Sequence, residues 1–117
     1  MMEGRLSWAV PVAFVSLFLG VGTFALASAE DAKQIAYGKH LSQECTGCHR
    51  LDGADNGIPS IIGWPAETLI ETLKFYQTGA RSNPVMVSVA TSLSEKQVTA
   101  LATYFATLPK PAPKQKK

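Results

Sequence analysis

The stretch Cys45-Thr46-Gly47-Cys48-His49 has the pattern C-x-x-C-H, and it sets the fold that we expect for the chain. Two thiols three positions apart can reach the two vinyl groups on one edge of a porphyrin and form thioethers. The imidazole that follows then lies beneath the ring, where it can bond the iron. We expect Gly47 to give the backbone the freedom that this approach requires. The motif therefore predicts one covalently bound haem c, attached through Cys45 and Cys48 and ligated by His49.

Three other interpretations of the two cysteines remain open. In an exported protein they could form a disulfide, and in a redox fold they could be catalytic. A thioredoxin-like motif, however, opens a helix after a strand, and no strand pattern precedes Cys45. A structural zinc site needs four ligands, and the chain has two cysteines and two histidines, with His40 shortly before Cys45.

The second axial ligand of such a haem is predicted by elimination. A thioether is a common partner of histidine on iron, and the first two methionines of the chain lie at its N-terminus, which leaves Met86. The preceding Asn83-Pro84-Val85 is expected to be extended or turning, not helical, and stiff enough to hold the sulfur. A methionine that only fills the core is the alternative. His40 is the rival ligand, but its place just before the motif predicts a surface histidine.

Three segments have helical patterns, and together they predict an all-α fold with long loops wrapped around one haem. The first runs over residues 31–43, with Asp31 in its first turn and Ala32, Ile35, Ala36 and Leu41 on its buried side. The second begins at Pro65 and ends near Gly79, two residues that suit a helix start and a helix end.

The third helix is expected from Ser94 to Leu108. Ser94 and Gln97 have the spacing of a capping box, and apolar residues recur after them at three- and four-residue intervals. Residues 44–64 and 80–93 carry no such pattern and are predicted to be irregular connections. A loop as long as the first is usually functional or wrapped around something.

The first 29 residues have the composition of a signal peptide. An apolar stretch from about Leu6 to Leu26 is followed by Ala27-Ser28-Ala29, a small-x-small cleavage pattern. An uncleaved membrane anchor is the alternative, since the stretch is nearly long enough to span a bilayer. We expect a signal peptide over 1–29, the haem-binding domain over 30–109, and a disordered basic tail over 110–117.

The charge of the chain argues against nucleic acid as a partner. Its 11 basic and 9 acidic residues give a net charge of +2. Four of the lysines, Lys110, Lys114, Lys116 and Lys117, lie in the tail, so the folded part is mildly acidic. No basic patch of the kind that binds phosphate backbones is evident.

With these motifs in this order, the chain resembles the class I cytochrome c family. Gly38 precedes the haem motif, a loop carries Gly57-Ile58-Pro59-Ser60-Ile61-Ile62-Gly63, and Met86 follows the middle helix. The last helix carries Leu101-Ala102-Thr103-Tyr104, similar to the family's L-x-x-Y/F pattern. The resemblance implies that the first and last helices cross closely, with Gly38 against Tyr104.

The resemblance also implies roles around the haem. The backbone carbonyl of Pro59 would accept the N–H of His49 and fix the ring. Trp64 would donate its indole N–H to a haem propionate, although plain burial would account for it equally well. Asn83 would bond near the sulfur of Met86.

In function, the resemblance implies a monohaem electron carrier in the periplasm, or anchored to its inner-membrane face if the N-terminal segment is retained. No catalytic residue is expected, because both axial positions are filled. The loop residues look most similar to the cytochrome subunit of flavocytochrome c sulfide dehydrogenase. The alternative function is therefore the electron-accepting subunit of a dehydrogenase, with a flavoprotein partner. A haem enzyme or sensor with an open distal site is a further rival.

Overall fold

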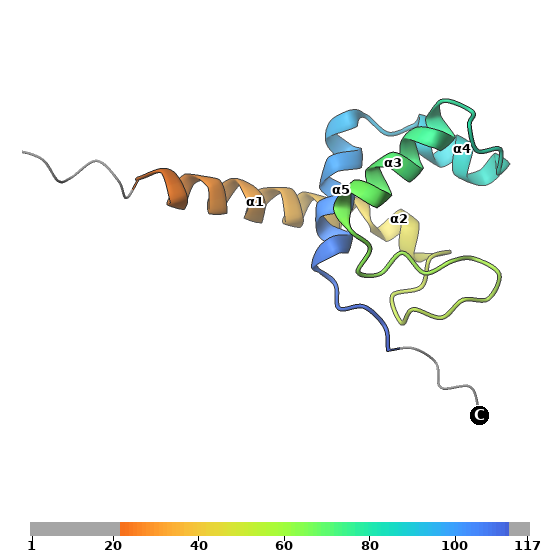
Figure 1. Ribbon diagram of the computed structural model, residues 1–117, viewed down its shortest axis with the longest axis horizontal. Coiled ribbons are helices and arrows are strands. Elements are labelled where there is room, and N and C mark those ends of the chain that lie inside the picture. The colour runs from red at the N-terminus through yellow and green to blue at the C-terminus, as the bar shows by residue number, and fades with distance from the viewer. Residues whose placement is uncertain (1–21, 113–117) are drawn as a thin grey trace, which may run out of the picture.

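The computed structural model describes residues 22–112, which form helices joined by irregular segments (Figure 1). No strand occurs within that range, so the predicted all-α fold is confirmed. The five helices described are α1 Gly22–Leu41, α2 Gln43–Thr46, α3 Ala66–Gln77, α4 Pro84–Thr91 and α5 Glu95–Thr107. Most of the predicted leader, residues 1–21, and the end of the predicted tail, residues 113–117, lie outside the described part of the chain.

The close crossing of α1 and α5 is present as predicted, and it joins the two ends of the domain. Gly38 is buried at this crossing. A Cβ placed on Gly38 would lie 2.7 Å from the Cβ of Tyr104 and would also collide with the carbonyl of Ala100. Only glycine therefore lets the two helix backbones approach this closely.

The bounds of α1 differ from the prediction at both ends. The helix already includes Gly22, so Asp31 lies in its middle rather than in its first turn. It ends at Leu41 because the Ser42 hydroxyl donates to the carbonyl of Lys39 at 2.8 Å. If the helix continued, the N–H of Gln43 would donate to this same carbonyl. A serine side chain that competes for a helix carbonyl favours a break in the helix.

The predicted buried side of α1 was only partly right. Ile35 and Leu41 are half-buried and pack against the core, whereas Ala32 and Ala36 are exposed. Figure 1 shows that the N-terminal part of α1 extends beyond the body and has no helix beside it. Ala36 follows the packed Ile35 directly, so its exposure comes from the face of the helix that it occupies.

Helices α3 and α5 supply most of the core, and both match the predicted patterns. In α5 the Ser94 hydroxyl accepts from the backbone N–H of Gln97 at 3.3 Å. The side-chain amide oxygen of Gln97 accepts in return from the backbone N–H of Ser94 at 2.9 Å. This confirms the predicted capping box. The buried apolar residues of the two helices are Leu69, Leu73, Val98, Ala100, Leu101, Ala102, Tyr104 and Phe105.

The expectation that residues 80–93 are irregular was wrong, because Pro84 begins helix α4. The Asn83 side chain accepts from the N–H groups of Val85 and Met86, both at 3.1 Å, and so caps the helix. Proline restricts the residue before it but fits the first helical position, where no N–H is needed. Met86 consequently lies in the first turn of a helix and not in an extended segment.

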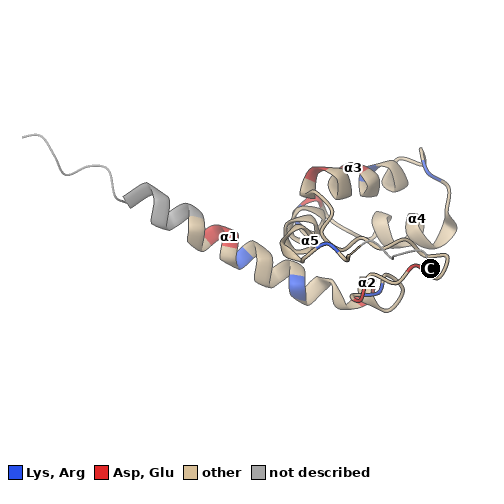
Figure 2. Cartoon of the chain, turned by 60° about the horizontal axis from the view of Figure 1, so that its bottom comes forward, with Lys and Arg blue, Asp and Glu red and all other residues tan. Residues whose placement is uncertain are grey.

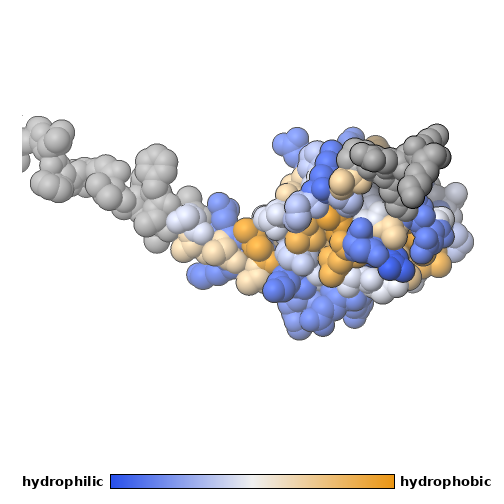
Figure 3. Space-filling view, turned by 90° about the horizontal axis from the view of Figure 1, so that it is seen from below, coloured by the Kyte–Doolittle hydropathy of each residue, from blue (hydrophilic) through white to orange (hydrophobic). Residues whose placement is uncertain are grey.

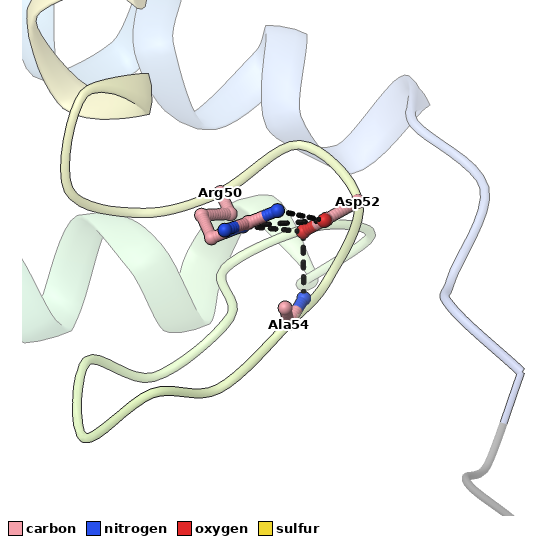
Figure 4. Close-up of polar contacts among 3 residues, drawn as sticks. All are labelled: Arg50, Asp52 and Ala54. Carbon is pink, nitrogen blue, oxygen red and sulfur yellow. Dashed lines mark hydrogen bonds and ion pairs between the residues drawn. The ribbon is translucent and has the colours of Figure 1, made fainter.

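The long loop after α2 is held by local turns and by the chain that leaves α5. Arg50 pairs with Asp52, and an Asp52 carboxylate oxygen also accepts from the N–H of Ala54 at 2.9 Å (Figure 4). Gly53 has a φ of 72°, and a Cβ there would collide with the ring of Pro111. The first residues of the predicted basic tail therefore lie against this loop.

The surface of the described residues carries charges of both signs. Figure 2 shows acidic residues followed by basic residues along α1, with other charged residues spread over α3 and the loops. The face in Figure 3 has apolar patches separated by hydrophilic side chains, not one continuous apolar area. Among the helices of residues 22–112, none has the length and hydropathy needed to cross a lipid bilayer.

Candidate functional site

The C-x-x-C-H motif folds as a short helix and the turn that follows it. Cys45 is in α2, and its carbonyl accepts from the N–H groups of Cys48 at 3.2 Å and His49 at 2.8 Å. These bonds coil the chain so tightly that all three functional side chains line one cavity. The role expected for Gly47 was wrong, because its φ is −64° and a Cβ there would have no protein atom within 4 Å.

The two cysteines are free thiols in this arrangement, not a disulfide. Cys45 is half-buried and Cys48 is exposed. Burial raises the pKa of the Cys45 thiol, and the neighbouring Glu44 carboxylate raises it further. Within residues 22–112 no group of three or more histidine, cysteine or acidic side chains is arranged so that it could hold a metal ion.

The hydrogen bond of His49 determines which of its ring nitrogens is free. Nδ1 lies 2.7 Å from the carbonyl oxygen of Pro59, the contact that the family resemblance implied. A carbonyl can only accept, so Nδ1 carries a proton and donates it to this bond, which leaves Nε2 as the nitrogen that can bind a metal. A histidine held in this way presents one metal-binding nitrogen in a fixed orientation.

The cavity next to the motif has a volume of about 340 Å³ and walls that are mainly apolar. This volume falls in the range of roughly 300–1,000 Å³ that cofactor sites usually have. Helices α3 and α5 form one wall, and the loop from Gly57 to Trp64 forms another. The apolar residues that line it include Ile61, Trp64, Leu69, Leu73, Leu101 and Phe105.

Met86 reaches the same cavity from α4, an element distant in sequence from the motif. The fold thus brings a thioether and an imidazole nitrogen to one apolar cavity, as the sequence led us to expect. His40, the rival ligand, is exposed and is not among the residues that line the cavity. These positions fit axial ligation of one iron by His49 and Met86.

The other residues expected at the site are also found around the cavity. Trp64 is half-buried in its wall. Asn83 lines the cavity as well, but its side-chain amide oxygen is used to cap α4. That cap was not predicted, although an asparagine directly before a proline is a helix-start signal.

Two further features were missed because they depend on tertiary structure. The guanidinium of Arg81 lies 5.5 Å from the centre of the Tyr76 ring, and both residues line the cavity. The Gln77 side chain donates to the carbonyls of Ala90 at 2.9 Å and Leu93 at 3.1 Å. No spacing rule in the sequence indicates such contacts.

Comparison with known proteins identifies the family. The family model described as Cytochrome c matches residues 35–109, a span that contains the motif, Pro59 and Met86. The chain belongs to the cytochrome c family. This cytochrome therefore binds haem c covalently and acts as an electron carrier, in agreement with the prediction from the motif. The cavity fits that group because it offers two free thiols, one oriented imidazole and an apolar interior.

Among the relatives of this cytochrome, a cytochrome c-553 of Helicobacter pylori is 32% identical over 95 residues, covering 79% of the chain and 96% of the relative. The thiosulfate dehydrogenase electron acceptor of Thiomonas intermedia is 44% identical, covering 59% of the chain and 35% of the relative. The cytochrome subunit of sulfide dehydrogenase of Chlorobaculum tepidum is 35% identical, covering 62% of the chain and 67% of the relative. The cytochrome thus spans about a third of the Thiomonas protein and nearly all of the Helicobacter one.

Proposed function

We propose that Cys45 and Cys48 hold the haem through thioethers and that His49 and Met86 fill the two axial positions of its iron. The observation that carries this proposal is the convergence of the Met86 thioether and the oriented His49 imidazole on one apolar cavity. Pro59 would fix the His49 ring through its carbonyl. Trp64 would support a propionate from the cavity wall.

The bound iron would supply a one-electron couple, and the chain would control how it is used. With His49 and Met86 both in place, no coordination position is left for a substrate, which favours electron transfer over catalysis. Methionine ligation and an apolar surrounding both favour the reduced iron and raise the potential. The open-site alternative, a haem enzyme or sensor, requires Met86 to be a packing residue only.

The ligand assignment is tested with the protein produced alongside haem-maturation enzymes. We expect a low-spin spectrum with the near-infrared sulfur-to-iron charge-transfer band in the oxidised state and no binding of carbon monoxide to the reduced state. Met86→Ala should abolish the band, lower the reduction potential and permit carbon monoxide to bind. An unchanged spectrum in Met86→Ala would reject Met86 as a ligand.

We further propose that this cytochrome accepts electrons from a dehydrogenase that oxidises an inorganic sulfur compound. Support comes from two relatives, which are named as a thiosulfate dehydrogenase electron acceptor and as a cytochrome subunit of sulfide dehydrogenase. If the donor oxidises sulfide, we propose a flavoprotein, as the resemblance of the loop residues to flavocytochrome c implies. Stopped-flow mixing of the oxidised cytochrome with each reduced dehydrogenase would distinguish the two donors, and slow reduction by both would reject the proposal.

The proposed location is the periplasm, with residues 1–29 removed as a signal peptide and retention as a membrane anchor as the alternative. Residues 28–30, around the expected cleavage bond, are exposed. Cleavage would leave the Gly38 crossing with α5 intact. The intact mass of the protein from fractionated cells decides between a mature N-terminus at Glu30 and a retained segment.

A further inference from the structure

The last residue of α3, Gln77, makes a link to α4 that the haem-binding motif does not explain. Its side chain is half-buried and lies within hydrogen-bond distance of two carbonyl oxygens, those of Ala90 and Leu93. Both partners can only accept, so the amide nitrogen must face them and donate both of its hydrogens. The contact therefore requires an amide of this length at position 77.

The Ala90 carbonyl is in the last turn of α4 and also accepts from the N–H of Leu93 at 3.1 Å, whereas Leu93 itself lies two residues beyond the end of the helix. Asn83 caps the other end of the same helix. Helix α4 consequently has a side chain bonded to its backbone at each end, and Met86 lies between them. Asn83 belongs to the segment that leads into α4, whereas Gln77 belongs to α3, which packs against α4 and also forms part of the cavity wall.

The rest of the polypeptide buries little of α4, so the polar contacts at its ends matter for its position. Of its eight residues only Ala90 is buried by the protein itself. Val85, Met86 and Val89 line the cavity, where a bound haem would cover them. A short helix with so few protein contacts opens readily unless other contacts restrain it.

We infer that Gln77 is a positioning residue for the axial methionine, because it fixes the end of α4 relative to the cavity and thereby holds the Met86 sulfur in place. This inference rests on the proposed ligation of iron by Met86. Loss of the two hydrogen bonds would leave His49 and both thioethers unaffected and would weaken only the bond on the methionine side.

The test compares Gln77→Leu, which keeps the approximate volume but removes both donors, with Gln97→Leu as the matched control. Gln97 is also a half-buried glutamine, and its side chain serves only the capping box of α5. Two hydrogen bonds of ordinary strength correspond to roughly a tenfold change in the equilibrium between bound and released methionine. In a pH titration of the oxidised protein, the charge-transfer band is lost when the methionine leaves the iron. We expect Gln77→Leu to lower the pH midpoint of this loss by about one unit.

Hydrogen exchange of α4 provides a second readout that does not depend on the iron. Gln77→Leu should speed exchange in α4, while Gln97→Leu should lower the urea midpoint without changing the band or α4. Gln77→Glu places an ionised carboxylate against two carbonyl oxygens, so it should have a larger effect than Gln77→Leu on both the band and α4 exchange. It also tests the inference if the leucine variant does not fold.

Three results would overturn the inference in distinguishable ways. If both Gln77 variants keep the band, its pH midpoint and α4 exchange, Gln77 does not position Met86. If α4 exchange rises but the band and its midpoint are unchanged, Gln77 only stabilises the helix. If the unmutated protein lacks the band, the ligation by Met86 is itself wrong and the inference falls with it.

Discussion

At the scale of single residues, the structure separates glycines that the fold requires from glycines that it tolerates. Gly38 lies where two helix backbones meet, and even one added carbon would collide with α5. Gly47 lies inside the haem motif but has ordinary helical φ and open space around it. Position in a functional motif is therefore a poor guide to steric need.

Gly38→Ala should destabilise the protein, because the added methyl forces α1 and α5 apart. Overpacking of this kind costs about 1–3 kcal/mol. Urea unfolding of the haem-loaded protein, followed by circular dichroism, measures the change. Gly47→Ala is the control, and its free energy of unfolding should stay within about 0.5 kcal/mol of that of the unmutated protein. Equal losses in the two variants would contradict the conclusion that only Gly38 is sterically required.

At the scale of elements, α4 carries Met86, the proposed axial ligand, and a side chain is bonded to its backbone at each end. Its cap was hidden in the sequence because Asn83-Pro84 was interpreted only as a restriction on the backbone. The same dipeptide satisfies two rules for a helix start, an asparagine at the cap and a proline in the first turn.

Asn83→Ala should therefore cost about 1 kcal/mol of unfolding free energy through the lost cap. It should also weaken the charge-transfer band, since Met86 lies in the turn that frays. Asn83→Asp keeps an acceptor at the cap and should restore both properties. Ser94→Ala removes the corresponding cap of α5 and should lower the free energy of unfolding by a similar amount without changing the band. Any loss of the band in Ser94→Ala would show that the band responds to general destabilisation and not to the α4 cap.

The sequence was sufficient to predict the parts of the fold that depend on short-range patterns. The Ser94–Gln97 box and the apolar spacing of α3 gave helices that match the structure closely. Elimination among the methionines pointed to Met86, which does line the cavity, although its backbone was wrongly expected to be extended or turning. The Gln77 link and the contact of Pro111 with Gly53 could not be predicted, because they join segments that only the tertiary fold brings together.

At the scale of the whole molecule, the cavity and the hydrophobic core are one continuous region. Leu69, Leu73, Leu101 and Phe105 belong to the core and also line the cavity. A domain this small buries a modest share of its surface, so an apolar group inside the cavity contributes a large part of its stability. Folding and haem attachment should accordingly depend on each other.

The double variant Cys45→Ala/Cys48→Ala, which cannot form thioethers, tests this dependence. We expect it to lose helical circular dichroism and to unfold without a cooperative transition at room temperature, because an empty cavity of this size is costly. The haem-loaded unmutated protein is the reference. A cooperative unfolding transition of similar midpoint in the variant would show that the polypeptide core suffices.

The shared core also affects how much of the protein a cell can accumulate. A chain that receives no haem would have an incomplete interior and would be accessible to proteases, whereas a loaded chain would resist them. The level of this cytochrome should therefore follow the supply of haem and of the enzymes that attach it, even when its gene is expressed at a constant rate. The packing of these four apolar side chains around the cavity would thus make the amount of this cytochrome depend on haem attachment.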